Sequence, residues 1–275
     1  MTFSIVARSA DGQALGVAVA SKFLAVGAAV PAAEADVGAL ATQSYANLAY
    51  RPQGLALLRT GVAAADVVAG LTAADPGRAQ RQLGVVGPVG DGATYTGDGC
   101  HDWAGGLAGD GYAIQGNILA GKQVVVAMAE AWAASDAAAP LGHRLLAALA
   151  AGDRAGGDRR GRQSAALLVV ARGQGYGGTS DVVADLRVDD HPEPVPELSR
   201  LLDLHALYFD KPDPATLLDL TGALADEVRA RLATLGHRDG DLDTALASWA
   251  GVENLEERLV PGRLDPLVLD HLRTA

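Results

Sequence analysis

Strand-like and helix-like segments alternate in groups along most of the chain. Short runs rich in Val, Ile and Ala, separated by Gly, Asp or Pro, predict four strands at 3–8, 15–21, 25–30 and 37–43. Two helices joined at Gly61 follow, and then a hairpin that turns at Gly90. The remaining segments predict strands at 111–119, 164–171 and 182–188, with two helices between 124 and 149. This grouping indicates an α+β fold, with helices on the outer faces of two stacked, mostly antiparallel sheets.

The composition limits both the interior and the partners of the chain. Apolar residues make up 49% of its 275 residues but aromatic residues only 4%, so we expect a core of small, closely packed side chains. The length allows one large domain with a small appendage. A net charge of −11 disfavours a nucleic-acid partner, because a phosphate backbone attracts basic surfaces. The Ala-rich composition is compatible with a homo-oligomer.

Cysteine usage, histidine spacing and hydropathy bound the cofactors and the location. Cys100 is the only cysteine, so one chain cannot hold a disulfide or a thiolate metal site. The histidines lack the spacing of a zinc site, and we expect no metal and no other cofactor. No run of about 20 apolar residues suits a membrane span, and no signal-like segment begins the sequence. We therefore expect a cytoplasmic protein without a membrane partner.

The chain changes character after residue 190. Three prolines between residues 192 and 196 predict a semi-rigid linker, which leads into a helix over 198–209. Asp213-Pro214 and Asp265-Pro266 each place an N-cap residue before a proline, a pattern typical of helix starts. The expected parts are a main domain at 1–192, a linker and helix at 193–211, and a small helical module at 212–275.

Thr2 is the first candidate for a catalytic residue. Removal of Met1 would leave its α-amine and its β-hydroxyl on one residue, which pairs a nucleophile with its own base. Lys22, one of three lysines in the chain, ends the second predicted strand, and its charge would lower the pKa of a nearby amine. In the alternative interpretation, Thr2 merely follows the start methionine and Lys22 is solvated.

Two other nucleophiles are weaker candidates. Ser4 lies on the same strand face as Thr2, but no histidine lies near it in sequence to act as a base. Cys100 precedes His101 directly, and adjacent residues on a strand point to opposite faces, which disfavours a Cys–His pair.

Several motifs together resemble a known family. They include TFSIVAR at 2–8, GVAVASKF at 16–23, YAIQGNILAG at 112–121 and GGDRRGRQSAALLVV at 156–170. The chain is similar to a bacterial and archaeal family of N-terminal-nucleophile (Ntn) hydrolase-like proteins of unassigned substrate. The resemblance implies a four-layer αββα sandwich. RLATLGH at 231–237 and ALASWAGVENLEER at 245–258 resemble a peptidoglycan-binding-like module.

The resemblance also implies a chemistry. In Ntn hydrolases the N-terminal hydroxyl or thiol attacks an amide carbonyl, the α-amine relays the proton, and water releases the acyl group. Thr2 matches that position, with a small-molecule amide as the implied substrate. Asn117 could stabilise the oxyanion, or could simply be a turn residue. Gln43 and Gln115 could hold the substrate amide, or could make ordinary structural hydrogen bonds.

The segment from Gly156 to Ser164 is the densest polar region and leads directly into a buried strand. Asp158 could orient Thr2 or Lys22, and Arg160 and Arg162, with Ser164, could bind a substrate carboxylate. The alternative is a solvated loop with internal ion pairs. The sequence therefore favours an amidohydrolase. The other interpretation is an inactive Ntn-like scaffold that binds a partner through its pocket or its C-terminal module.

Overall fold

The computed structural model describes residues 2–238 and 240–275 and divides the chain into two compact units, Met1–Leu202 and Asp203–Ala275. The division falls inside helix α6, Pro194–Phe209, and not in a proline linker. Pro194 and Pro196 lie in the first turn of this helix. The first N–H groups of a helix have no partner within it, so proline is tolerated there. The segment expected to be a linker is therefore helical from Pro194 onward.

Six antiparallel strands form the larger sheet of the first unit, in the order β10-β9-β2-β1-β8-β7. Their bounds are Thr2–Arg8 (β1), Ala14–Ser21 (β2), Gly105–Gly109 (β7), Tyr112–Asn117 (β8), Ser164–Ala171 (β9) and Val182–Val188 (β10). The nearly continuous apolar run of β9 is buried along its length, as the sequence predicted for a strand covered on both faces. β1 and β2, which carry the N-terminal motifs, lie in the interior of this sheet.

Four antiparallel strands form the smaller sheet, in the order β3-β4-β5-β6. Their bounds are Pro31–Glu34 (β3), Gly38–Ser44 (β4), Arg81–Val86 (β5) and Ala93–Thr96 (β6). The predicted hairpin with its turn at Gly90 is confirmed, and Gly90 has a φ of 76°, which favours glycine. The strand predicted at 25–30 is wrong, because Val26–Ala29 forms the short helix α1. Short runs rich in Ala suit either structure.

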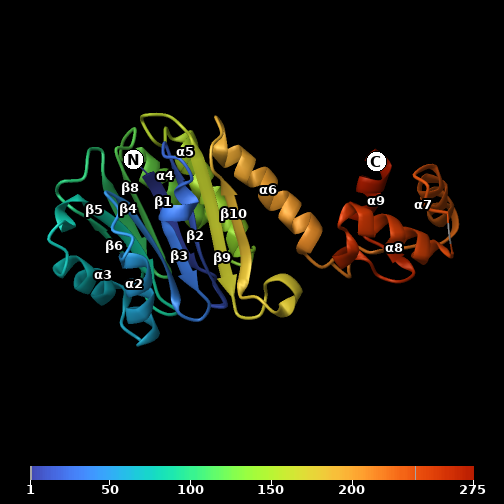
Figure 1. Ribbon diagram of the computed structural model, residues 1–275, viewed down its shortest axis with the longest axis horizontal. Helices are drawn as coiled ribbons and strands as arrows, with labels where there is room; N and C mark the ends of the chain where they lie inside the picture. Colours follow the sequence, from blue (N-terminus) through green and yellow to red (C-terminus); the bar gives the residue numbers. More distant parts are fainter. Residues whose placement is uncertain (1, 239) are drawn as a thin grey trace. The chain divides into compact units, whose positions relative to one another are not determined.

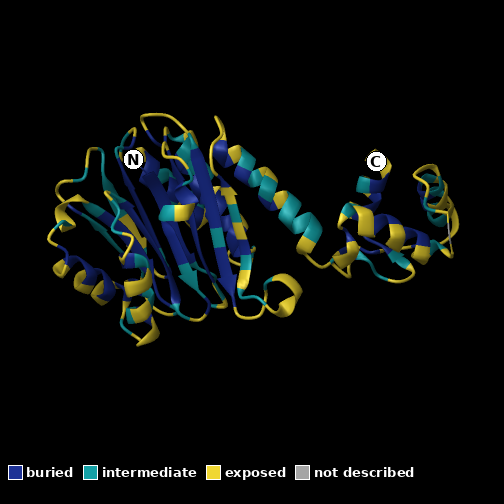
Figure 2. Ribbon diagram, viewed as in Figure 1, coloured by how far each residue is buried: buried dark blue, intermediate teal, exposed yellow. Residues whose placement is uncertain are grey.

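Helices cover the outer faces of both sheets (Figure 1). α4, Gln123–Ala134, and α5, Leu141–Arg154, pack on the larger sheet, and α2, Tyr50–Arg59, and α3, Ala64–Ala73, pack on the smaller one. Separate apolar clusters fill the three interfaces, under each pair of helices and between the sheets. The first unit therefore has four layers, helices, sheet, sheet and helices. Its inner strands, such as β1, β2 and β4, are buried along almost their whole length (Figure 2).

The second unit is a small helical unit with its own core. It contains three helices, α7 (Gly222–Thr234), α8 (Leu242–Glu253) and α9 (Pro266–Thr274). A single-turn helix, η3 (Glu256–Arg258), and a two-stranded ribbon of β11 (Leu218–Asp219) and β12 (Arg263–Leu264) complete it. Asp265 caps α9 by accepting a hydrogen bond from the Leu267 amide at 2.9 Å, which confirms the helix start predicted there. The helix start predicted at Asp213-Pro214 is wrong, because residues 214–216 form a turn.

Candidate active site

A row of polar side chains crosses four neighbouring strands at one end of the larger sheet. Thr2 on β1 is paired with Asn117 on β8, and Ser21 on β2 is paired with Ser164 on β9. The hydroxyls of Thr2 and Ser21 lie 3.1 Å apart and link the two pairs. Residues opposite each other in an antiparallel sheet share a face, so the four side chains form one continuous row. All four are buried, Thr2 with 6% of its surface exposed.

The row faces the smaller sheet. The Ser4 hydroxyl, two residues along β1 from Thr2, donates to Gln43 Oε1 on β4 at 2.7 Å. Side chains two residues apart on a strand share a face, so the Thr2 side chain points into the same layer. Gln43 Nε2 also donates to the Thr2 carbonyl oxygen at 3.3 Å. The Thr2 hydroxyl therefore lies between the sheets, at the end where β1 begins.

Buried amides connect the two sheets beneath this row. Gln82 Oε1 on β5 accepts from Gln43 Nε2 at 2.8 Å and from Asn117 Nδ2 at 2.9 Å. Gln115 Nε2 donates to the Ser4 hydroxyl at 2.6 Å, while Gln115 Oε1 is buried and makes no hydrogen bond to the described part of the chain. Gln43 and Gln115 thus make the structural hydrogen bonds of the alternative interpretation, and Asn117 is a strand residue, not a turn residue.

Gln82 is the member of this network that sequence reasoning missed. Its Nε2 also donates to the Gly116 carbonyl at 2.7 Å and to Thr96 Oγ1 at 2.9 Å, so one side chain ties β5 to β6 and β8. Only the register of the strands reveals this role. In the sequence, Gln82 follows Gln80 and Arg81 at the start of an apolar strand, and nothing there sets it apart from them.

Asp158 lies beside the end of β2. Its carboxylate accepts from the backbone N–H of Lys22 and from that of Arg160, both at 2.8 Å. Asp158 therefore fixes the chain where it leaves the sheet next to Ser21. The Lys22 side chain is exposed, and its Nζ donates to the Arg162 carbonyl at 3.2 Å. We expected the Lys22 ammonium to contact Thr2, and it does not. Lys22 is the residue after Ser21, and its side chain points to solvent and not along the polar row.

Two of the three arginines in the 156–164 segment, Arg160 and Arg162, form ion pairs within it or next to it. Arg160 Nη2 lies 3.2 Å from Asp158 Oδ2, and Arg162 Nε donates to Asp153 Oδ1 at 2.8 Å. The hydrogen bond to Asp153 raises the pKa of Arg162 above its usual value. Both guanidinium groups are therefore balanced by nearby carboxylates, as expected for a loop with internal ion pairs.

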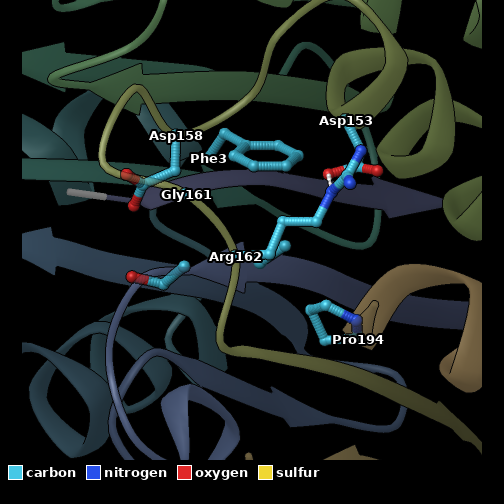
Figure 3. A pocket seen from close by; sticks show the side chains of 8 residues that line it. Phe3, Asp153, Asp158, Gly161, Arg162 and Pro194 are labelled. Atoms are coloured by element: carbon cyan, nitrogen blue, oxygen red, sulfur yellow. Dashed lines mark hydrogen bonds and ion pairs between the residues drawn. The ribbon is translucent and has the colours of Figure 1, made fainter. Parts of the chain in front are cut away.

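A small pocket lies where these groups meet (Figure 3). It has a volume of about 10 Å³, room for about one water molecule, and Phe3, Ser21, Asp158 and Arg162 are among the residues that line it. A more open hollow of about 360 Å³ shares Asp158 and Arg162 with it. Phe3 belongs to the apolar cluster under α4 and α5. The pocket therefore lies on the helix-covered side of the sheet, and the Thr2 hydroxyl lies on the other side.

Ser164 has a different place from the one expected. Its hydroxyl donates to the Phe23 carbonyl oxygen and accepts from the Val26 N–H at 3.1 Å, and the residue is fully buried. Ser164 therefore holds the loop that follows β2 and has no surface to offer a substrate.

Three of the five described non-glycine residues in the left-handed region lie at the same end of the sheets. Ala25, Ser44 and Ile118 have φ values of 52°, 69° and 49°, and each lies within or just beyond the end of β2, β4 or β8. This conformation is unfavourable for residues other than glycine, most of all for a β-branched one such as Ile118. Such strain gathers at functional sites, where the surrounding structure holds it in place.

The described residues hold neither a metal-binding cluster nor a membrane-spanning helix. In residues 2–238 and 240–275, no three His, Cys, Asp or Glu side chains lie close enough to hold a metal ion. Over the same residues, no helix has the length and apolar character needed to cross a membrane.

Comparison with known families gives the chain its relatives. Residues 2–198 match the model described as "Family of unknown function (DUF1028)". The chain belongs to the DUF1028 family. The match covers almost all of the first unit, which we call the DUF1028 unit. Residues 208–272 match a second model, described as "Putative peptidoglycan binding domain".

A solved structure supports this assignment. The crystal structure of protein SPO2555 from Silicibacter pomeroyi, also designated DUF1028, is similar to this chain with a TM-score of 0.67 and 32% sequence identity. The similarity covers 82% of this chain and 92% of that one. The search of curated proteins found no match. These relatives establish the family but name no activity for it.

Proposed function

We propose that the DUF1028 unit is an Ntn-type amidohydrolase that cleaves a small amide with Thr2 as nucleophile. The observation that carries this proposal is the position of Thr2, which begins an interior strand with its hydroxyl 3.1 Å from that of Ser21. The hydroxyl lies in a buried polar row between two sheets that are each covered by helices. This layered arrangement agrees with the αββα sandwich of Ntn hydrolases.

The proposed reaction needs removal of Met1, which lies outside the described residues. The free α-amine of Thr2 then accepts the hydroxyl proton as Oγ1 attacks the carbonyl carbon of the substrate. The C–N bond breaks, the leaving amine takes that proton, and an ester with Thr2 remains. Water attacks the ester, gives one proton to the α-amine and releases the acid. The amine returns a proton to Oγ1, which restores the hydroxyl.

The surrounding residues then act as donors and supports. Asn117 Nδ2 carries two N–H groups, and its bond to Gln82 leaves the second for the developing oxyanion. Gln43 holds the Thr2 carbonyl, and Gln82 orients Asn117. Asp158 fixes the backbone at Lys22 beside the Ser21 hydroxyl.

Chains with a defined N-terminus test the mechanism. A cleavable fusion releases mature protein that begins at Thr2, and intact-mass measurement verifies it. Screening against an amide library should give turnover with this protein. Thr2→Ser should retain part of the rate, and Thr2→Ala should lose at least about 1000-fold, because the nucleophile is absent. A chain that keeps Met1 should be equally inactive. Turnover that survives in Thr2→Ala would exclude the mechanism.

A specific observation supports a second candidate, a binding protein on an inactive scaffold. Gln43 and Gln82 bond to each other, and the guanidinium groups of Arg160 and Arg162 lie beside carboxylates, which leaves few polar groups for chemistry. Native protein that retains Met1, binds a small molecule and turns over no amide would favour this function.

We propose the cytoplasm as the location, because removal of an N-terminal methionine takes place there. Under this proposal the second unit does not meet mature cell wall, although its family description names peptidoglycan. Retention of the full-length chain on purified peptidoglycan, with recovery from the cell exterior, would contradict it.

A further inference from the structure

Four large apolar side chains stand exposed on two loops of the DUF1028 unit. Phe23 and Leu24 follow β2 and are 53% and 60% exposed, and Tyr45 and Leu48 follow β4 and are 55% and 52% exposed. We call these four residues the apolar rim. A chain with only 4% aromatic residues gains nothing in stability from exposing two of them so close to strand ends.

The rim lies at the end of the sheets where Thr2 lies. Ser21, the last residue of β2, contacts the Thr2 hydroxyl, and the rim residues Phe23 and Leu24 follow within three positions. On the facing sheet, Gln43 contacts the Thr2 carbonyl two residues before Tyr45. The two loops therefore border the space between the sheets from opposite sides, at the end that holds the Thr2 hydroxyl.

Both loops are held in place by buried groups. Ser164 bonds to the Phe23 carbonyl and the Val26 amide, which fixes the loop after β2. Arg81 donates to the Tyr45 carbonyl, and Asp75 accepts from Arg81 and from Asn47, which fixes the loop after β4. The exposed side chains thus project from a rigid support, as the residues of a preformed binding site do.

Two of the arginines near this site already have carboxylate partners. Arg160 and Arg162, the arginines expected to bind a carboxylate, lie in ion pairs with Asp158 and Asp153. A ligand carboxylate that binds at either of these two arginines would have to displace its ion pair. The rim itself carries no charged side chain, so it matches an uncharged apolar group.

We propose that the apolar rim binds the acyl group of the substrate and that this group is an alkyl chain or an aromatic ring. This inference rests on the proposed hydrolase, because Thr2 supplies the reference point for the acyl carbon. A second copy of the chain is the other occupant to consider. Four side chains that are each nearly half buried offer much less than the roughly 800 Å² per partner of a stable protein interface.

Binding to mature Thr2→Ala protein tests the rim separately from catalysis. Isothermal titration calorimetry compares acetyl, butyryl, hexanoyl and succinyl amides of one amine. Affinity should rise about fourfold for each added methylene from acetyl to hexanoyl, the value expected for burial of apolar surface. The succinyl amide, which carries a carboxylate, should bind more weakly than the butyryl amide of similar length.

Rim variants locate the effect. Phe23→Ser and Tyr45→Ser should each remove at least a third of the logarithmic gain from acetyl to hexanoyl. The controls Val89→Ser and Tyr176→Ser alter more exposed apolar residues outside the rim, at 79% and 76% exposure, and should keep the full gain. Affinity that is flat with chain length, tighter binding of the succinyl amide, or a dimer that dissociates in Phe23→Ser would overturn the proposal. Chain-length-dependent binding without any turnover would instead support the rim and reject the hydrolase.

Discussion

Asp75 is the residue on which the loop after β4 depends. Its carboxylate accepts from Arg81 Nε at 2.8 Å, from the Tyr50 hydroxyl at 2.9 Å and from Asn47 Nδ2 at 3.3 Å. The hydrogen bond from Arg81, together with the others, holds the pKa of Asp75 far below its usual value. Burial of Tyr50 raises the pKa of that phenol, so it stays a neutral donor.

The depressed pKa of Asp75 predicts a pH dependence of stability. A carboxyl whose pKa is lower in the folded state stabilises the fold above its unfolded pKa, and this contribution is lost as pH falls. Asp75→Asn should destabilise the DUF1028 unit by about 2–4 kcal/mol at pH 7, since it breaks a buried ion pair. The difference from wild type should shrink between about pH 5 and pH 2. Thermal melts across this range measure it.

An exposed carboxylate provides the control for Asp75. Asp98→Asn makes the same chemical change on the surface and should alter stability by less than about 0.5 kcal/mol at any of these pH values. A stability difference between Asp75→Asn and wild type that is the same at pH 2.5 and pH 7 would show that the ion pair is not the cause.

For single residues, the sequence predicted which residues belong to the candidate site better than it predicted the partners that they contact. Thr2 and Asn117 were both singled out, and the register of β1 and β8 pairs them. Gln82 was missed because its partners, Gln43 and Asn117, lie 39 and 35 positions away in the sequence. The predicted contact between Lys22 and Thr2 was wrong, because it depends on the direction in which the Lys22 side chain points just after β2 ends. No local pattern carries such information, because strand pairing alone sets it.

Strand β2 packs closely against β9 and α5 at Gly16, where there is no room for a side chain. A Cβ atom on Gly16 of β2 would lie 2.8 Å from the Leu168 carbonyl oxygen of β9 and 2.7 Å from Leu145 Cδ1 of α5. The backbone oxygen cannot move without disturbing the pairing of β2 with β9. Gly16 therefore sets the spacing of β2, which carries Ser21 at its end.

A matched pair of glycine substitutions tests this packing. Gly16→Ala should destabilise the DUF1028 unit by about 1–3 kcal/mol, because the added methyl group overpacks the interface of β2, β9 and α5. Gly70→Ala, in helix α3, meets no atom within 4 Å and should stabilise by about 0.5–1 kcal/mol through helix propensity. Urea unfolding measures both. Equal effects of the two substitutions would contradict the packing argument.

The helices and strands differ in how well the sequence pattern predicted them. The long helices were predicted from their helical periodicity, and β9 from a nearly continuous apolar run of eight residues. Val26–Ala29 was misassigned because four residues of Val, Gly and Ala show no period. The proline-rich start of α6 was misassigned because proline in the first turn of a helix resembles a linker in sequence.

The two units of the whole molecule have separate cores. Leu246 and Trp249 of α8 belong to an apolar cluster composed entirely of residues from Asp203–Ala275. Within this unit, Arg258 and Asp265 form an ion pair at 2.6 Å with 6% and 3% of their side chains exposed. Arg258 also donates to the carbonyl oxygens of Ala206 and Leu207, both at 2.6 Å. The pair therefore joins the end of α6 to the start of α9.

This separation predicts that the full-length chain unfolds in two calorimetric steps. Asp265→Asn breaks a buried ion pair, which costs about 3–5 kcal/mol, and should lower the melting temperature of one step by about 10 °C or more. The step that belongs to the DUF1028 unit should stay unchanged in Asp265→Asn. Asp75→Asn should shift only the step of the DUF1028 unit. Glu257→Gln, which removes an exposed ion pair in the same unit as Asp265, should move neither step measurably. A single step that shifts with both Asp265→Asn and Asp75→Asn would mean that the units fold as one, because cores that unfold independently cannot transmit a local loss of stability to each other.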